Sequence, residues 1–205
     1  MITGVILAGG LNRRMGGKLK ALLPIQGQPL IIKQLNEMKK ICKQIILVSN
    51  EPEKLLPWIE KSPDVDVQCI KDFYVQQGPL SGIHAASLAA TEPLMWIVGC
   101  DMPFISAQAA QAMGKLCQEA NVDAVVPVIE GRTHPLHAVY TRLIGSEAEL
   151  LLKQEKFRLM GLLDHIDWQP VEEEFFDSHH IAPHFAANIN TPEEYENMLV
   201  NLSSP

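Results

Sequence analysis

Short apolar runs alternate with amphipathic stretches along most of this chain of 205 residues. The apolar runs are typical of buried strands, and the stretches between them have the spacing of apolar positions expected for helices. The predicted strands span residues 2–8, 44–49, 66–70, 94–99 and 123–128. The predicted helices span residues 29–41, 53–59, 80–90 and 106–120. This alternation predicts a mostly parallel sheet whose strands are joined by crossover helices.

The alternation of strand-like and helix-like segments becomes less regular after Glu130-Gly131. Residues 135–140 predict a strand at or near the antiparallel edge that mixed sheets often carry. Two short helices are expected at residues 143–153 and 158–163. Residues 172–183 are acidic and then rich in His, which predicts a surface connection. With no internal repeat, low-complexity tract or linker, residues 1–205 predict one α/β domain, a Rossmann-like three-layer sandwich with a mostly parallel sheet.

Composition limits the classes of partner. An apolar content of 47% and a mean hydropathy of +0.04 fit one globular domain with a well-buried core. The formal charge of -7 argues against a general nucleic-acid surface, which would need many cations. No long apolar run or secretory leader pattern is present, so we expect no membrane partner and a cytoplasmic location. The cysteines lack metal-ligand spacing, and buried thiols are expected at Cys42, Cys69, Cys100 and Cys117.

A glycine-rich, cationic segment follows the first predicted strand. The apolar run from Val5 to Ala8 ends at Gly9-Gly10. The cations that follow are Arg13, Arg14, Lys18 and Lys20. Backbone N–H groups and positive charge at such a turn favour a polyphosphate ligand, with a purely structural turn as the alternative. A P-loop is excluded because Gly17 stands where its Lys should be, and the adjacent Gly9 and Gly10 do not fit the dinucleotide fingerprint.

The segment Leu7-Ala8-Gly9-Gly10, continued by Arg14-Met15-Gly16-Gly17 and then Lys20, resembles the signature loop of the MobA-like nucleotidyltransferases, most closely that of molybdenum cofactor guanylyltransferases. The family pattern is L-A-G-G-x-x-x-R-M-G-G-x-D-K, and the related cytidylyltransferases more often have L-A-A-G, so Gly9 favours guanine. The resemblance spans nearly the whole chain. It implies a fold of the nucleotide-diphospho-sugar transferase type, with a nucleotide-binding half at about residues 1–105 and an acceptor-binding half at about 106–205.

The resemblance implies roles for individual loop residues. Leu7, Ala8, Gly9 and Gly10 would wrap the phosphates of the nucleotide. Arg14 and Lys20 would neutralise the departing diphosphate.

Leu19 departs from the family pattern, which has Asp at this position. If that Asp orients the neighbouring cations, the substitution Leu19→Asp should raise activity. Alternatively, Leu19 belongs to an apolar patch that packs the exit of the loop, and the same substitution should lower it.

Polar side chains follow the other predicted strands, at the carboxyl ends where ligands bind in open parallel sheets. Ser49-Asn50 either forms an ordinary turn or, as the resemblance implies, places Asn50 near the base. Asp72 can accept hydrogen bonds from the ring N–H and amine of guanine. Asp101 predicts a Mg²⁺ ion held between its carboxylate and the phosphates. Ser106 is a competent cap for the next helix, which leaves Asp101 free for this role.

Two later motifs also match the family. Gly78-Pro79-Leu80-Ser81-Gly82 corresponds to its G-P-L-A/S-G element, and residues 188–194 correspond to N-x-N-T-P-E-E. Thr191-Pro192 with Glu194 is also a helix start, but that start does not explain the two asparagines. The resemblance implies that the acceptor is bound by Gly78, Gly82, Arg158, Asn188 and Asn190. A plain helix start at Gly78 and a surface arginine at Arg158 are the alternatives.

Histidines are expected to play structural or solvent-exposed roles. His134 and His137 lie beside Pro135 in a segment that also resembles the family, and a structural role is favoured for both. The remaining group lacks metal-ligand spacing, and solvated loop histidines are expected at His179, His180 and His184.

The function implied by the resemblance is transfer of GMP from GTP to the terminal phosphate of molybdopterin (Mo-molybdopterin), with Mg²⁺ and release of diphosphate. No candidate nucleophile is needed, because the acceptor phosphate is already anionic and catalysis requires positioning and charge stabilisation. Other cofactor-biosynthesis proteins and molybdoenzyme apoproteins or their chaperones are the further partners implied. The alternatives are a cytidylyltransferase acting on the pterin or on a sugar or polyol phosphate, and a nucleotide-binding relative without activity.

Overall fold

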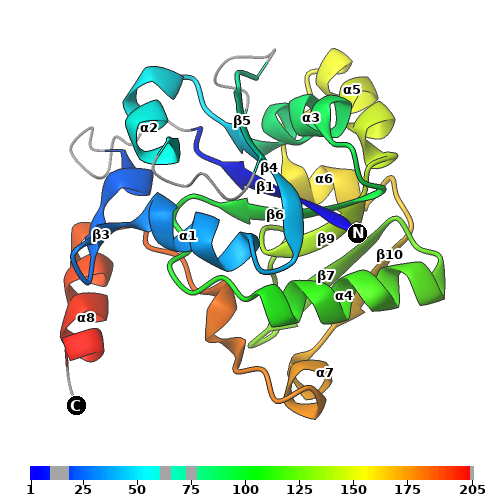
Figure 1. Ribbon diagram of the computed structural model, residues 1–205. Helices are drawn as coiled ribbons and strands as arrows, with labels where there is room; N and C mark the ends of the chain where they lie inside the picture. The colour runs from blue at the N-terminus through cyan, green and yellow to red at the C-terminus, as the bar shows by residue number, and fades with distance from the viewer. Residues whose placement is uncertain (10–18, 61–65, 73–77, 204–205) are drawn as a thin grey trace.

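The computed structural model describes residues 1–9, 19–60, 66–72 and 78–203. Within these ranges, an eight-stranded sheet runs between two layers of helices (Figure 1). The strand order is β10-β7-β9-β6-β1-β4-β5, and β8 pairs with β7. The bounds are β1 Ile2–Leu7, β4 Cys42–Val48, β5 Asp66–Ile70, β6 Leu94–Gly99, β7 Ala124–Ile129, β8 Arg132–Thr133, β9 Ala138–Thr141 and β10 Trp168–Val171.

The helices fall into two sets, one on each face of the sheet. The first set packs on the core cluster that contains Trp96 and comprises α1 Leu30–Met38, α2 Pro52–Ile59, α4 Ala107–Ala120 and α7 Glu173–Ser178. The second set packs on the cluster that contains Tyr140 and comprises α3 Pro79–Ala89, α5 Ile144–Lys153 and α6 Leu159–Leu163. None of the helices in the described ranges is long and apolar enough to cross a membrane.

The central strands are mostly apolar because both of their faces are covered. In β1, Ile2 and Ile6 face one cluster, whereas Val5 and Leu7 face the other. Strand side chains alternate between the two faces of a sheet, so a strand covered on both sides must be apolar at nearly every position. Strand β1 pairs in parallel with β4 and β6, and β4 pairs in parallel with β5. The predicted three-layer α/β fold with a mostly parallel sheet is confirmed.

The expectation that residues 135–140 form a strand at or near the antiparallel edge is confirmed for the strand and its direction but wrong for its place in the sheet. Strand β9 is antiparallel, as expected, but it lies inside the sheet between β6 and β7. The buried side chains from Ala138 to Tyr140 require cover on both faces, and the strand has neighbours on both sides. The edge is taken instead by β10, a strand that the hydrophobic pattern did not reveal.

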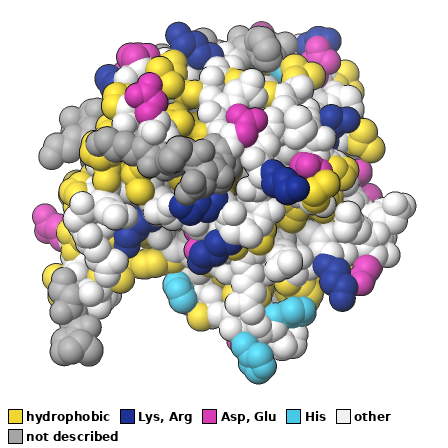
Figure 2. Space-filling model, in the orientation of Figure 1, with side chains coloured by type: hydrophobic (Ala, Val, Ile, Leu, Met, Phe, Trp, Pro, Cys, Tyr) yellow, Lys and Arg dark blue, Asp and Glu magenta, His cyan; other side chains and the backbone are white. Residues whose placement is uncertain are grey.

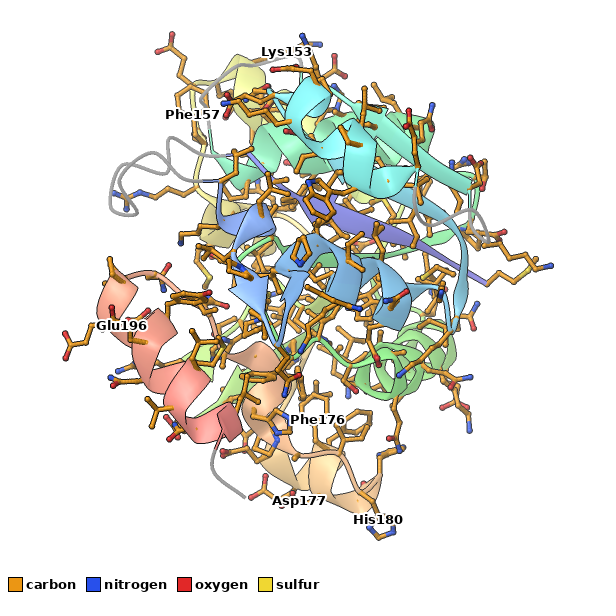
Figure 3. All side chains as sticks on the ribbon, turned by 60° about the vertical axis from the view of Figure 1, so that its left-hand side comes forward. Lys153, Phe157, Phe176, Asp177, His180 and Glu196 are labelled. Atoms are coloured by element: carbon orange, nitrogen blue, oxygen red, sulfur yellow. The ribbon has the colours of Figure 1, made fainter. Side chains whose placement is uncertain are left out.

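The prediction of a plain surface connection at residues 172–183 is also wrong in part. This segment contains α7, and Phe176 is fully buried against Phe185. Figure 3 shows Phe176 inside the molecule, while Asp177 and His180 lie at its outer end. Ile181 is buried in the same core cluster and Phe175 packs against that cluster, so the acidic composition of the segment hid the apolar residues that dock this short helix on the core.

A small unit with its own hydrophobic core packs the C-terminal segment against residues near the start of the chain. It contains the hairpin of β2 Pro24–Ile25 and β3 Gln28–Pro29, which the sequence pattern did not predict, and helix α8 Pro192–Ser203. Ile25, Leu30, Ile189 and Met198 form its buried core, and Figure 1 shows α8 beside β3. The predicted helix start is confirmed. Thr191 Oγ1 accepts from Glu194 N at 3.1 Å, and Glu194 Oε2 accepts from Thr191 N at 3.3 Å.

Candidate active site

The carboxyl ends of β1, β4 and β6 are tied together by backbone hydrogen bonds beyond the sheet ladders. Ala8 N donates to Val48 O at 2.8 Å, and Cys100 N donates to Leu7 O at 3.0 Å. The chain segments that leave these strands therefore begin from one fixed edge. This is the edge of an open α/β sheet at which ligands bind.

The glycine-rich loop begins at this edge. Leu7 and Ala8 are buried, and the bonds above already use the Leu7 carbonyl and the Ala8 N–H group, whereas Gly9 is exposed. Gly10 and Arg14 lie outside the described residues, so their contacts with phosphates stay predictions. In the part of the loop that the structure describes, Gly9 has the backbone most open to a ligand.

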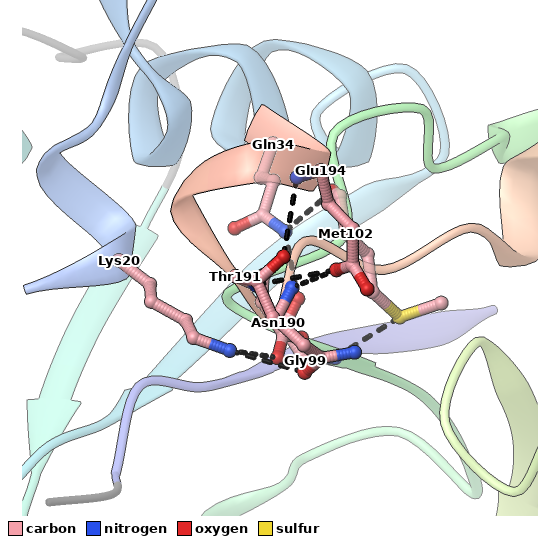
Figure 4. A network of polar contacts seen from close by, with 8 residues as sticks. Lys20, Gln34, Gly99, Met102, Asn190, Thr191 and Glu194 are labelled. Carbon is pink, nitrogen blue, oxygen red and sulfur yellow. Dashed lines mark hydrogen bonds and ion pairs between the residues drawn. The ribbon is translucent and has the colours of Figure 1, made fainter. Parts of the chain in front are cut away.

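Lys20, Asp101 and Asn190 meet at this edge from three distant parts of the sequence, and Figure 4 shows Lys20 reaching toward Asn190. Lys20 Nζ lies 3.0 Å from Asp101 Oδ2 and donates to Asn190 Oδ1 at 3.2 Å. The side chains of Lys20 and Asp101 are 15% and 21% exposed. Lys20 belongs to η2 Lys20–Leu22, Asp101 follows β6, and Asn190 precedes α8. The structure thus brings together two predicted catalytic residues and one predicted acceptor contact.

The backbone around Asp101 forms a tight turn. Met102 N donates to Gly99 O at 3.3 Å, and Ile189 N donates to Asp101 O at 2.8 Å. A Cβ atom at Gly99 would stand 2.6 Å from Asp101 Oδ1, so a residue with a side chain would displace the carboxylate. Ser106 Oγ caps α4 by accepting from Ala109 N, which confirms that Asp101 is not needed as the cap.

The sequence pattern did not single out Gln34, whose side chain makes hydrogen bonds to the backbone of this turn. Gln34 lies on the buried face of α1, and Nε2 donates to Gly99 O at 2.8 Å and to Met102 O at 2.9 Å. The available signal was a polar residue among the apolar positions Ile31, Leu35 and Met38, which all point to the core.

Asp72 and Asn50 come together beyond β5 and β4. A side-chain hydrogen bond from Asn50 lowers the pKa of Asp72, but burial has the larger effect and raises it. Asp72 Oδ1 is buried without a hydrogen-bond partner among the described residues. Ser49 Oγ accepts from Glu51 N at 3.1 Å, so Ser49 forms the ordinary turn considered above. A buried, unpaired carboxylate oxygen is costly unless a ligand supplies a donor.

The candidate acceptor residues divide into two groups. Gly78 has a positive φ of 77° before α3, and a Cβ atom there would stand 3.3 Å from Phe157 O. The exposed Arg158 follows Phe157, which is labelled in Figure 3, so Gly78 and Arg158 lie in adjoining segments. Gly82 is buried, and a Cβ atom there would stand 2.9 Å from Leu7 Cδ2. The absence of a side chain at Gly82 permits α3 to pack on the sheet, and contact of Gly82 with the acceptor stays a prediction.

Asn188 and Leu19 lie close in sequence to members of the group formed by Lys20, Asp101 and Asn190. Asn188 is exposed, two residues before Asn190. Leu19 is half-buried and packs on the core cluster beneath α1, and its carbonyl accepts from Leu22 N at 2.9 Å. This position supports the apolar packing role for Leu19. It argues against the alternative, in which an Asp at position 19 would orient the neighbouring cations without disturbing the packing.

The comparisons with known proteins agree with this geometry. A family model described as the MobA-like NTP transferase domain matches residues 4–167. The chain belongs to the MobA-like NTP transferase family. A "Probable molybdenum cofactor guanylyltransferase" of Methanosarcina acetivorans is 33% identical over 96% of this chain and 89% of its own length. The protein is a nucleotidyltransferase of this family.

Solved structures show the same fold. Molybdopterin-guanine dinucleotide biosynthesis protein A of Archaeoglobus fulgidus superposes with a TM-score of 0.81 at 23% identity, covering 98% of both chains. The 4-diphosphocytidyl-2C-methyl-D-erythritol synthase of Anaerococcus prevotii superposes with a TM-score of 0.74 at 13% identity, covering 100% of this chain and 99% of its own. The predicted nucleotide-diphospho-sugar transferase type of fold is confirmed.

His134 and His137 have structural positions in this MobA-like protein, and the predicted exposure of His179, His180 and His184 is confirmed. His137 is fully buried, Nε2 accepts from Ser106 N at 2.8 Å, and burial lowers its pKa to about 3. His134 is half-buried and its pKa is also lowered, chiefly by burial. His179 and His184 contact Phe175 and Phe104. Across the described ranges, no group of three or more His, Cys, Asp or Glu side chains could hold a metal ion.

The charges near the site suit binding of an anionic ligand. They also suit catalysis by charge stabilisation, with no protein nucleophile. Figure 2 shows several Lys and Arg side chains near the middle of the face in view, although the net charge of the chain is -7. Cys100 adjoins Asp101, but burial raises the pKa of its thiol to about 12, so the thiol stays protonated at neutral pH.

Asp101 fits one part of a divalent-cation site. Its carboxylate is a hard oxygen ligand, partly open to solvent, and its contact among the described side chains is the one from Lys20 to Oδ2. Because no further described ligand cluster is present, phosphate oxygens and water would supply the remaining ligands. This is the way in which proteins usually hold Mg²⁺ with one or two carboxylates.

Proposed function

We propose that this protein transfers GMP from GTP to the terminal phosphate of molybdopterin, forming the guanine dinucleotide form of the molybdenum cofactor and releasing diphosphate. Similarity over nearly the full chain to proteins named molybdenum cofactor guanylyltransferase supports this function. The structural observation that carries it is the buried Asp72 Oδ1, which has no described partner and adjoins Asn50. The ring N–H and amine of guanine supply the donors that this oxygen lacks.

The reaction needs orientation and charge neutralisation more than it needs a base. An oxygen of the acceptor phosphate attacks the α-phosphorus of GTP, and the bond from that phosphorus to the bridging oxygen of the β-phosphate breaks. Lys20 and Arg14 stabilise the departing diphosphate, which carries the electron pair of the broken bond. Preorganised cations at the place where charge develops commonly account for a large share of the rate enhancement.

Family members of this type depend on a divalent cation, and we assign the ion here as Mg²⁺. Asp101 would hold it, and the ion would neutralise phosphate charge and orient the reacting groups when bound. Lys20 pairs with the same carboxylate at 3.0 Å and neutralises its charge. Asn190 gives the Lys20 ammonium group a second acceptor, which keeps the lysine at the site if the carboxylate turns to a cation.

The acceptor is placed on the side formed by the later part of the chain. Gly78 and Arg158 lie in adjoining segments, and Asn188 and Asn190 precede α8. Arg158 can pair with the terminal phosphate of the acceptor because its exposed guanidinium is free to reach a phosphate. This division puts nucleotide contacts at about residues 1–105 and acceptor contacts at about 106–205, with Gly78 as a contact shared between the halves.

The test is release of diphosphate with GTP, CTP, ATP and UTP, each with and without molybdopterin. We expect release with GTP and molybdopterin together, in the presence of Mg²⁺, and little release when either is omitted. Comparable turnover with CTP would instead identify a cytidylyltransferase. Binding of GTP without turnover on any acceptor would identify a nucleotide-binding relative without activity.

A further inference from the structure

Gln34 is a buried amide that makes two hydrogen bonds to the Asp101 turn (Figure 4). The side chain is 1% exposed, and both bonds are donated by Nε2, to Gly99 O and to Met102 O. These two carbonyls stand immediately before and after the dipeptide Cys100-Asp101. A single amide nitrogen therefore fixes both ends of the short segment that aims the carboxylate.

Two weaker bonds also join Gly99 and Met102 within the turn, and in the first of them Gly99 N donates to Met102 Sδ at 3.4 Å. The turn hydrogen bond from Met102 N to Gly99 O measures 3.3 Å, which is at the long end of the usual range. Ile189 N donates to the Asp101 carbonyl, which lies between the two carbonyls that Gln34 holds. Without the Gln34 amide, Met102 O would lack its donor and the turn would be free to open.

Helix α1 also holds the segment that carries Lys20, which is the partner of the Asp101 carboxylate. Leu30 N donates to Leu23 O at 2.9 Å, directly after η2, which carries Lys20. Farther along α1, Glu37 Oε1 accepts from Ala107 N at 2.9 Å, at the start of α4. One helix thus holds the segment of Lys20 at one end and both ends of the 99–107 connection through Gln34 and Glu37.

We propose that Gln34 is a positioning residue for catalysis, which sets the place of the Asp101 carboxylate relative to Lys20 and the bound phosphates. The inference rests on the proposed function, because it takes Asp101 as the carboxylate that holds the divalent cation. Gln34 itself touches no substrate. It acts through the backbone of the Asp101 turn, whose displacement by about 1 Å can lower a rate about a hundredfold.

Gln34→Met tests the two hydrogen bonds because it keeps the length of the side chain and removes the amide. Gln44→Met is a matched control at the opposite end of the sheet, where Gln44 is buried and bonds Thr3, Ala89 O and Thr91. Both variants should have lower melting temperatures. At saturating GTP and Mg²⁺, kcat of Gln34→Met should fall on the order of tenfold or more with little change in KM, whereas kcat of Gln44→Met should stay within about twofold.

Gln34→Glu adds a pH profile that a merely structural role would not produce. A neutral carboxyl group has one O–H donor for the two carbonyls, whereas the ionised form has none and repels both. Burial of the introduced carboxyl raises its pKa, so the neutral form gains population as the pH falls from about 8 to about 6. Over this range, the kcat of Gln34→Glu relative to the unmodified enzyme should rise.

Hydrogen exchange separates this inference from the proposed function. Peptides that cover residues 99–107 should exchange faster in Gln34→Met than in Gln44→Met. Unchanged exchange in these peptides, or an unchanged kcat in folded Gln34→Met, would overturn the inference, as would a flat relative pH profile for Gln34→Glu. Absence of GMP transfer by the unmodified protein would overturn the proposed function, and the exchange comparison would still decide whether Gln34 holds the turn.

Discussion

Lys20 Nζ and Asp101 Oδ2 lie 3.0 Å apart, although 81 positions separate the two residues in the sequence. The contact joins the end of the glycine-rich loop to the turn after β6, and Asn190 extends it to the entrance of α8. In a largely buried position, each charge compensates the desolvation of the other. In the proposed function, a bound polyphosphate would change this balance, because it would compete for the lysine and bring its own negative charge close to the carboxylate.

Asp101→Asn should remove Mg²⁺-dependent turnover while the protein stays folded. The amide has nearly the same volume but no negative charge, and losing one such electrostatic contact costs on the order of a hundredfold or more in rate. Diphosphate release and a thermal melt measure the two effects. Asp177→Asn, at an exposed position on α7, is the control and should leave the rate unchanged. Near-normal activity in a folded Asp101→Asn protein would show that the metal assignment is wrong.

Lys20→Ala should weaken binding of GTP more than binding of GMP. The β- and γ-phosphates, which GMP lacks, are the groups that a lysine at the end of the loop would neutralise. Calorimetric titration with both nucleotides measures the difference. Lys115→Ala is the control, because the Lys115 side chain is 77% exposed on α4 and should affect neither ligand. Equal small losses for GTP and GMP would place Lys20 away from the terminal phosphates.

Asp72→Asn should reduce the preference for guanine. The amide places donors where the guanine N–H groups also point, so kcat/KM for GTP should fall on the order of tenfold or more, while the low rates with ATP and CTP change little. Asp66→Asn, at the other end of β5, is the matched control. An unchanged ratio of GTP to CTP turnover in Asp72→Asn would remove Asp72 from the base site.

The same carboxyl group predicts a pH dependence for the unmodified enzyme. Burial raises the pKa of Asp72, and only the ionised form accepts both guanine donors. The value of kcat/KM for GTP should therefore fall as the pH is lowered through this raised pKa. In Asp72→Asn that acidic limb should be absent, and its persistence would assign it to another group.

Leu19→Asp should lower both the melting temperature and the activity. The side chain packs on the core, so a carboxylate there loses apolar burial and must be desolvated or displace the start of η2. The loss of stability should be about 1–3 kcal/mol. Leu143→Asp is the control, because Leu143 is 75% exposed and should tolerate the change. A gain of activity without loss of stability would restore the idea that a carboxylate at position 19 orients the cations.

His137 predicts a loss of stability in mild acid. Burial holds its folded-state pKa at about 3, below the ordinary value of 6.5, so the unfolded chain binds a proton that the folded protein excludes. Stability from this group is complete above about pH 6.5 and is lost as the pH falls toward 3, with a slope of at most about 1.4 kcal/mol per pH unit. Denaturant unfolding at several pH values measures it. His137→Gln should be less stable at neutral pH but should lack this slope.

Much of the fold followed from local pattern because buried strands and amphipathic helices have distinct periods. The bounds of β5 and β6 were predicted without error, and the capping box at Thr191 was visible in the residues themselves. The place of β9 was not predictable in this way. An apolar strand of four residues fits an edge or an interior equally well, and only pairing with both β6 and β7 decides between them.

The loop motif and the residues after each strand indicated the family and predicted the phosphate-binding edge and the base and metal contacts, because these depend on residue type and spacing along the chain. The tertiary structure decided which residues act together. It placed Lys20 against Asp101 and Asn190, assigned Gly82 and Leu19 to packing, and brought Gln34 beneath the Asp101 turn. Such contacts join positions far apart in sequence, and their geometry is set by how the helices pack on the sheet, which no local pattern records.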